Sequence, residues 1–212
     1  MRSLKLMFCV GLLLAGCGQT NTVVEESPDL EVTETPPLVA PEDAEEADDS
    51  LAQRDLIVQA VYDSADELNL CDGYLEAETL DDSEVYVLSA DQYLVQFLCN
   101  FAAYQGVYEF LIYTDDGADA VVTPLELTVY VPDETGQFTP MSDRLVAGLP
   151  FFDTEEQVLT NFTKGRGIGD CGSFARYEWN GELLELIEYR YRECDSEGAP
   201  FIEPEDYPQV YP

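Results

Sequence analysis

The sequence contains no histidine among its 212 residues. This absence excludes Ser-His-Asp and Cys-His catalysis, and it removes the commonest zinc ligand and the usual general base near neutral pH. Carboxylate chemistry of the glycosidase type remains open, because a pair of Asp or Glu residues suffices for it. With 44 acidic residues in the chain, any such pair is unspecific. We therefore expect no cofactor and no metal site, and the sequence names no catalytic residue.

Positive charge is also scarce. Nine Lys and Arg residues stand against 44 Asp and Glu, which gives a formal net charge of -35. Such a surface repels phosphates, so we exclude nucleic acid as a partner. Most of the cations gather in one C-terminal stretch: Lys164, Arg166, Arg176, Arg190 and Arg192.

The sequence has no apolar run long enough for a permanent membrane span. The longest, Leu6–Leu14, follows Arg2 and Lys5 and ends in Leu14-Ala15-Gly16-Cys17. A basic start, a short apolar core and small residues before a cysteine are typical of a bacterial lipoprotein signal. We expect residues 1–16 to be removed and Cys17 to be lipidated; an ordinary secretory signal is the alternative.

The expected anchor places the protein on a membrane of the bacterial cell envelope. Gly18 follows the cysteine, where an aspartate would favour the inner membrane of a Gram-negative host. We therefore expect the outer membrane, with the protein facing the periplasm. Multiple acyl chains on Cys17 would make this attachment stable.

Residues 17–50 are expected to form a lipidated, acidic and disordered tether, and residues 51–212 a single globular domain. The tether holds eleven acidic residues, no Lys or Arg and no aromatic residue, so it buries too little apolar surface to fold. The remaining length is enough for one hydrophobic core.

The domain is predicted to be α+β, with an N-terminal helix followed by a mainly antiparallel, disulfide-linked sheet. Ser50 to Gln53 has the spacing of a capping box, and an apolar stripe at helical spacing follows: Ile57, Val58, Val61, Ala65 and Leu68. Runs typical of strands come next, at 85–88, 93–101, 107–113 and 125–131. Asn180-Gly181 predicts a two-residue type I′ turn between two further strands, although a helix through Leu183, Leu186 and Ile187 is possible.

Four cysteines remain in the domain: Cys71, Cys99, Cys171 and Cys194. An even number in an exported protein indicates disulfides, whereas metal binding would need closer cysteine spacing or histidine. Of the three possible pairings we favour Cys71 with Cys99 and Cys171 with Cys194, because each joins neighbouring segments. Residues 113–119 offer calcium-type oxygen ligands, but they lack EF-hand spacing and are better explained as a polar turn.

A glycine-rich segment, residues 164–172, lies at the centre of the cationic stretch. Its glycines permit positive φ angles, and successive N–H groups beside Arg166 could hold a carboxylate or phosphate. We therefore name a possible anion or partner site: Lys164, Arg166, Gly167, Gly169 and Arg176. The competing interpretation is a tight structural loop whose charges are paired, for instance with Asp170.

The same segment carries a family resemblance. Residues 164–172, followed by residues 177–181 and Cys194, resemble the signature of domain-of-unknown-function family 1176, uncharacterised exported bacterial proteins. The block 99–105 is similar to an upstream family block, and the end of the chain, 203–212, resembles short cyanobacterial members. Many members are longer and carry six cysteines. The family implies no activity and no catalytic residues.

Two functions therefore stand as hypotheses. The first is an envelope lipoprotein with a non-catalytic domain that binds an envelope protein, a glycan or another anionic partner. The second is a carboxylate-based hydrolase of envelope glycans, which would need two carboxyl groups in one cleft, one with a raised pKa.

Overall fold

The computed structural model describes residues 43–117, 120–194 and 200–212. The predicted signal peptide, the lipidation site Cys17 and residues 18–42 of the tether lie outside the described residues. The helical elements are α1 (Asp43–Asp63), α2 (Ala65–Leu68), η1 (Leu70–Gly73), η2 (Ala77–Asp82) and η3 (Pro204–Asp206). The strands are β1 (Glu84–Val87), β2 (Gln92–Phe101), β3 (Gly106–Asp115), β4 (Ala120–Pro124), β5 (Leu127–Pro132), β6 (Phe138–Asp143), β7 (Val146–Asp153), β8 (Val158–Lys164), β9 (Gly172–Trp179), β10 (Leu184–Arg192) and β11 (Gln209–Tyr211).

The predicted α+β class is wrong, because the described chain is predominantly an antiparallel β structure. A nine-stranded sheet has the order β1-β2-β3-β7-β8-β9-β10-β11, with β4 also paired to β3, and β5 and β6 form a separate two-stranded sheet. Apart from α1, the described helices are short, of three to six residues each. Runs at 146–153 and 158–164, which the sequence patterns did not single out, supply two central strands and shift the balance towards β.

The sheet has two parts that meet at β3 and β7. Strands β1 to β4 pair in chain order, and so do β7 to β11. Between these parts, Gly106, Val107 and Tyr108 pair with Gly148, Ala147 and Val146. A short register of three residue pairs therefore joins them.

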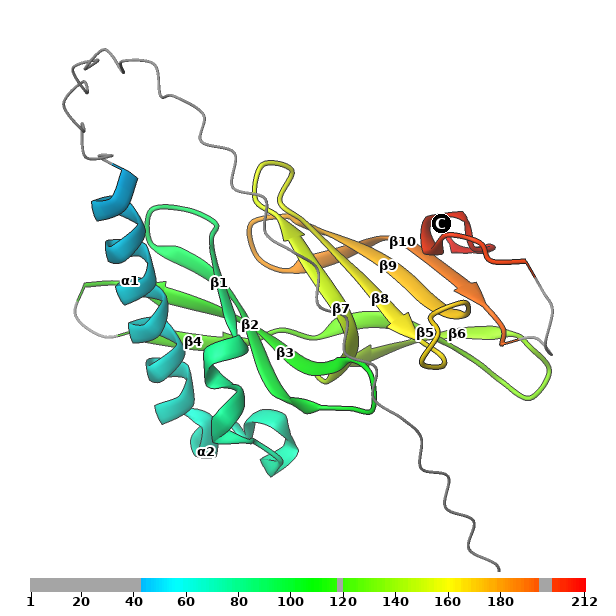
Figure 1. Ribbon diagram of the computed structural model, residues 1–212, viewed down its shortest axis with the longest axis horizontal. Helices are drawn as coiled ribbons and strands as arrows, with labels where there is room; N and C mark the ends of the chain where they lie inside the picture. The colour runs from blue at the N-terminus through cyan, green and yellow to red at the C-terminus, as the bar shows by residue number, and fades with distance from the viewer. Residues whose placement is uncertain (1–42, 118–119, 195–199) are drawn as a thin grey trace, which may run out of the picture. The chain divides into compact units, whose positions relative to one another are not determined.

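Helix α1 covers one face of the first part of the sheet (Figure 1). Ile57, Val58 and Val61 are 1%, 4% and 0% exposed and pack against Val95 and Phe97 of β2 in one core cluster. The first three residues of the predicted apolar stripe are thus the buried face of α1, whereas Ala65 and Leu68 lie in the separate helix α2, which has no buried residue. The predicted capping box at Ser50 is wrong, because the helix begins at Asp43 and Ser50 lies inside it.

Strand β2 is covered on both faces, as its nearly unbroken apolar run predicts. Val95 and Phe97 lie in the α1 core, whereas Leu94 belongs to a second cluster with Phe110 and Tyr177. The β5–β6 hairpin closes this second cluster, and the Tyr177 and Tyr189 hydroxyls donate to the carbonyls of Thr128 and Tyr130 on β5, at 3.0 and 3.1 Å.

The β9–β10 hairpin confirms the predicted strands but not the predicted turn. Trp179 pairs with Leu184, so four residues form the connection instead of two. The Asn180 side chain accepts the N–H groups of Glu182 and Leu183, both at 3.0 Å, and thereby closes the loop. No helix forms through Leu183, Leu186 and Ile187, which lie in or beside β10.

Candidate functional site

The glycine-rich segment is a tight loop between the antiparallel neighbours β8 and β9. Lys164 and Gly172 are cross-strand partners at its base, and the Gly165 N–H donates to the Cys171 carbonyl at 2.9 Å. Gly172 has φ +134°, and a Cβ atom there would lie 2.0 Å from the Thr163 carbonyl oxygen. The sequence needs glycine at this position because the two strands approach too closely for a side chain.

Arg166 is engaged inside the loop. Its Nε donates to Asp170 Oδ1 at 2.7 Å, and its Nη2 makes a second, parallel contact with Oδ2. These hydrogen bonds hold the pKa of Asp170 below its ordinary value. At Arg166 and Asp170, the structure agrees with the competing interpretation of the sequence, which was a structural loop with paired charges.

The structure brings together four of the five predicted site residues and separates the fifth. Lys164, Arg166, Gly167 and Gly169 lie in one loop, where Gly169 has φ +70°. Arg176 lies four residues along β9 from Gly172, which is about 13 Å away along an extended strand. Its side chain lies 3.7 Å from Glu188 and 4.0 Å from Glu156.

The loop is fixed to three other parts of the chain. The Cys171–Cys194 disulfide ties it to the end of β10. The Gln105 side chain, from the β2–β3 turn, accepts the Lys164 backbone N–H at 2.8 Å. The Tyr207 hydroxyl, from the C-terminal segment, donates to the Gly169 carbonyl at 3.4 Å. The loop is therefore held as a rigid projection.

Three large apolar side chains are exposed in this loop and at the neighbouring β2–β3 connection. Ile168 is 76% exposed, Phe101 60% and Tyr104 42%. The Tyr104 ring packs against Gly167, since a Cβ atom on that glycine would lie 3.5 Å from it. We call Phe101, Tyr104 and Ile168 the loop-pair face. The charge pattern of the sequence pointed to the loop's cations, and no periodic signal marked these three residues.

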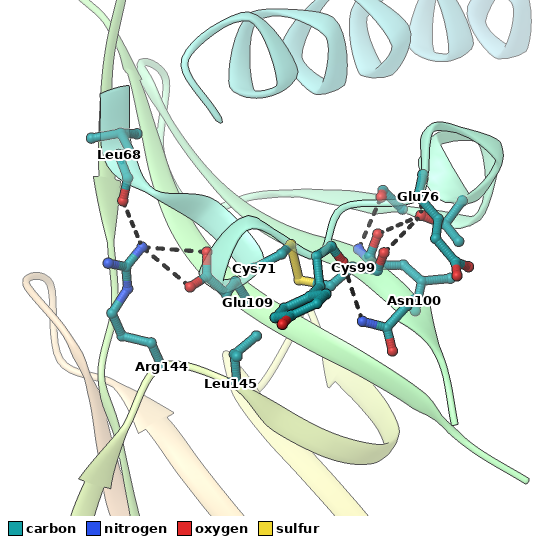
Figure 2. The surroundings of a disulfide bond; sticks show 12 residues. Leu68, Cys71, Glu76, Cys99, Asn100, Glu109, Arg144 and Leu145 are labelled. Carbon is teal, nitrogen blue, oxygen red and sulfur yellow. Dashed lines mark hydrogen bonds and ion pairs between the residues drawn. A yellow bond between two sulfur atoms is a disulfide. The ribbon is translucent and has the colours of Figure 1, made fainter. Parts of the chain in front are cut away.

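The second disulfide, Cys71–Cys99, lies beside a buried ion pair (Figure 2). The Glu109 side chain is 2% exposed, and the Arg144 Nη2 lies 3.2 Å from its Oε1. The same nitrogen donates to the Leu68 carbonyl at 3.3 Å, as the dashed lines in Figure 2 show. Burial raises the pKa of Glu109, while Arg144 and the Cys71 N–H, which donates to the carboxylate, oppose the rise.

This ion pair supports a strained turn. Asn69, Cys71 and Asp72 have φ angles of 49°, 58° and 50°. Non-glycine residues in this region cost of order 1 kcal/mol each, so the surrounding contacts must hold them. Glu109 and Arg144 hold the turn through the Cys71 N–H and the Leu68 carbonyl, and the disulfide ties it to Cys99 on β2. No local sequence pattern predicts this cluster, because Arg144 is 76 residues from Leu68 and 35 residues from Glu109.

Glu109 is placed as a structural anchor and not as an acid facing a cleft. Two grooves of about 470 and 500 Å³ adjoin the turn, and their lining residues include Asp66, Asn69, Tyr74 and Glu76 but not Glu109. The hydrolase hypothesis needs a raised-pKa carboxyl group in contact with substrate. The geometry at Glu109 does not meet that requirement.

The four domain cysteines form two disulfides, Cys71–Cys99 and Cys171–Cys194. This is the pairing favoured from the sequence. In residues 43–117, 120–194 and 200–212, no group of three or more His, Cys, Asp or Glu residues is arranged to hold a metal ion. In the described part of 113–119, residues 113–115 end strand β3, and the Gly117 N–H donates to the Asp115 side chain at 2.9 Å just after the strand.

The comparison with protein families decides where the chain belongs. A family model described as "Protein of unknown function (DUF1176)" matches residues 16–205. The chain is a member of the DUF1176 family. The match confirms the resemblance seen in the glycine-rich segment, and it extends beyond the domain into the tether. DUF1176 carries no described activity, so membership assigns no role to Ile168, Glu109 or any other residue.

No curated protein and no solved structure matches the chain. Within the described residues, none of the helices has the length and apolar character needed to cross a membrane.

Proposed function

We propose that this DUF1176 protein is a bacterial envelope lipoprotein, lipidated at Cys17, whose β domain binds a partner protein without catalysis. The segment between Cys17 and the start of α1 at Asp43 would hold the domain off the membrane. The proposal combines the N-terminal sequence pattern with the geometry of the domain.

The observation that carries the binding role is the loop-pair face. Tyr104 and Ile168 expose large apolar surfaces on two loops that are already fixed to each other, and Phe101 is exposed at the end of β2, next to the first of these loops. A rigid apolar projection loses little conformational entropy on binding, and exposed aromatic side chains are typical anchors in protein interfaces.

The charge of the chain limits the partner. With 44 acidic and nine basic residues, the protein repels an acidic surface over a long range. We therefore expect a partner that offers an apolar pocket within a neutral or basic surface.

A photo-crosslinking amino acid at position 168, in intact cells, tests this role. We expect one envelope protein to be captured from position 168. The matched control is position 56, because Leu56 on α1 is 72% exposed and lies outside the loop-pair face. Capture should be lost when Tyr104→Ala removes the ring beneath Gly167. Equal capture from both positions, or none from either, would contradict a binding role for this face.

The lipid anchor gives a separate prediction. Cys17→Ser should abolish incorporation of a labelled fatty acid and move the protein from the membrane fraction to the soluble fraction. Three acyl chains contribute far more than the marginal binding of a single chain, so we expect nearly complete release. Cys9→Ser, within the segment expected to be removed, serves as the control and should change neither result. Persistent labelling of the Cys17→Ser variant would refute lipidation at that residue.

A further inference from the structure

The two disulfides differ in their access to solvent. Cys71 and Cys99 are 1% and 0% exposed and lie inside the α1 core. Cys171 is also buried, at 1%, but its partner Cys194 is exposed at the end of β10. A thiol from solution can therefore approach one disulfide without unfolding of the core.

Glycine at position 165 lets the loop backbone pack directly against this disulfide, so a thiol must approach from the exposed side of Cys194. A Cβ atom on Gly165 would lie 2.6 Å from Cys194 Sγ and 3.2 Å from Cys171 Sγ. Any other residue would place its side chain against the sulfur atoms. Gly165 is itself exposed, so the disulfide lies directly behind bare backbone.

The two disulfides also differ in the charged residues around them. Each has acidic neighbours in the sequence, since Asp72 follows Cys71, Asp170 precedes Cys171 and Glu193 precedes Cys194. The second disulfide also has three cations nearby, of which Arg166 is paired with Asp170. Cys71 lies beside Asp72 and donates its N–H to the Glu109 carboxylate, so negative charge disfavours a thiolate there. At the other disulfide, Lys164 and Arg166 flank Gly165. Arg192 lies two residues before Cys194 and opposite Gly172. Nearby cations stabilise thiolates, both as attacking and as leaving groups.

Arg192 strengthens this contrast. It is 8% exposed, its Nη2 donates to the Pro200 carbonyl at 2.9 Å, and its Nη1 has no hydrogen-bond partner among the residues that the structure describes. A buried guanidinium with an unused donor adds positive potential next to the disulfide.

We propose that Cys171–Cys194 is a thiol–disulfide exchange site for a dithiol reductant, with Cys194 Sγ as the attacked atom. The proposal rests on the proposed envelope location for the place of the reaction, and it adds a means of regulating the loop-pair face.

The reaction balances as a two-electron exchange. One thiolate of the dithiol attacks Cys194 Sγ, the bond between Cys194 and Cys171 breaks, and Cys171 leaves as a thiolate beside the cations. The second thiolate then attacks the reductant's own sulfur in the mixed disulfide and releases the Cys194 thiolate. The dithiol becomes a disulfide and releases two protons to solvent. The Cys171 and Cys194 thiolates take up two protons from solvent, so the exchange balances.

Reduction would loosen the loop without unfolding the domain. The Gly165 N–H bond to Cys171, the Arg166–Asp170 pair and the β8–β9 ladder do not depend on the sulfur–sulfur bond. The covalent tie between the loop and β10 is lost, however, and the loop-pair face loses part of its rigidity.

The test uses the full chain and graded dithiothreitol at neutral pH, followed by rapid alkylation and mass spectrometry of the cysteine peptides. We expect Cys171 and Cys194 to become alkylated at a reductant concentration at least about tenfold lower than Cys71 and Cys99. Reduction of both pairs together, or of Cys71–Cys99 first, would overturn the proposal. A low dose of the monothiol cysteamine should form its adduct on Cys194; an adduct mainly on Cys171 would overturn the assignment of the attacked atom.

Two charge variants test whether nearby cations speed the thiol–disulfide exchange. Lys164→Gln should slow exchange several-fold, whereas Arg176→Gln, which removes a cation about 13 Å along the strand from Gly172, should leave the rate unchanged. Equal rates in the two variants would remove the role of the local cations. The alkylation and exchange-rate measurements need no partner protein. They therefore test the exchange site even if the crosslinking experiment at position 168 fails.

Discussion

Arg144→Met should lower the free energy of unfolding by about 3 kcal/mol at pH 7, and by clearly less at pH 5. Removing one member of a buried ion pair leaves the other charge without a partner, which commonly costs 3–5 kcal/mol. We take the lower end because the Arg144 side chain is 33% exposed, so solvent already screens part of the interaction. Methionine retains most of the apolar stem of arginine. Urea unfolding at the two pH values measures the effect.

The pH dependence follows from the direction of the Glu109 pKa shift. Because the folded-state pKa of Glu109 is raised, folding favours its protonated form, and stability from this group is lost as the pH rises through that folded pKa. Without Arg144, which opposes the rise, the folded pKa moves higher still. The loss of unfolding free energy in Arg144→Met should therefore become smaller as the pH falls and Glu109 becomes neutral.

Two further variants control this result. Arg176→Met removes only long, partly exposed ion pairs, 4.0 Å to Glu156 and 3.7 Å to Glu188, and it should cost less than about 1 kcal/mol at either pH. In the double variant Glu109→Gln with Arg144→Met, no unpaired buried charge remains, so the loss should no longer depend on pH between 5 and 7. A deficit for Arg144→Met that is equal at pH 5 and pH 7 would mean that Glu109 does not carry the effect.

Gly172→Ala should destabilise the domain by about 3–5 kcal/mol. A methyl group at this position would lie 2.0 Å from the Thr163 carbonyl oxygen and 2.8 Å from the Gly165 nitrogen, both of which belong to the backbone. The φ angle of +134° adds conformational strain for any residue with a Cβ atom. Relief requires β8 and β9 to separate at their Lys164–Gly172 pair, next to the disulfide. Chemical denaturation and the yield of the oxidised protein both report the loss.

Gly181→Ala separates strain from steric overlap. Gly181 also has a positive φ, +98°, but no atom lies within 4 Å of an added Cβ. Its replacement should therefore cost only about 1–2 kcal/mol, the conformational part alone. Similar losses for the two variants would show that close approach of the strands is not the reason for glycine at position 172.

Local sequence patterns predicted individual strands better than they predicted the overall balance of helix and strand. The apolar run of β2 correctly indicated a strand buried on both faces, because such a run has no other stable place in a β protein. The shorter β7 contains Gly148 and Pro150, and β8 contains Asn161, so neither showed a clear alternation. Without these two strands, the sequence patterns predicted a smaller sheet, and the N-terminal helix placed the domain in the α+β class.

The predicted turn and cap were placed near the right elements but with the wrong local geometry, and contacts between distant segments were missed. Asn180-Gly181 did mark the hairpin, but the Asn180 side chain accepts two backbone N–H groups and so stabilises a four-residue loop instead. The Glu109–Arg144 pair, and the meeting of Tyr104 with Gly167, join segments that are distant in the sequence. Patterns within one segment contain no information about such pairs.

The narrow junction between the two parts of the sheet has a consequence for folding kinetics. Within each part, every strand pairs with a neighbour in the chain, so most ladders close over short loops and form early. The pairing of Gly106–Tyr108 with Val146–Gly148 is the exception, since it must close a loop that contains β4, β5 and β6. We expect this closure to limit the folding rate, so that substitutions at the junction would slow folding more than equally destabilising ones within either hairpin series.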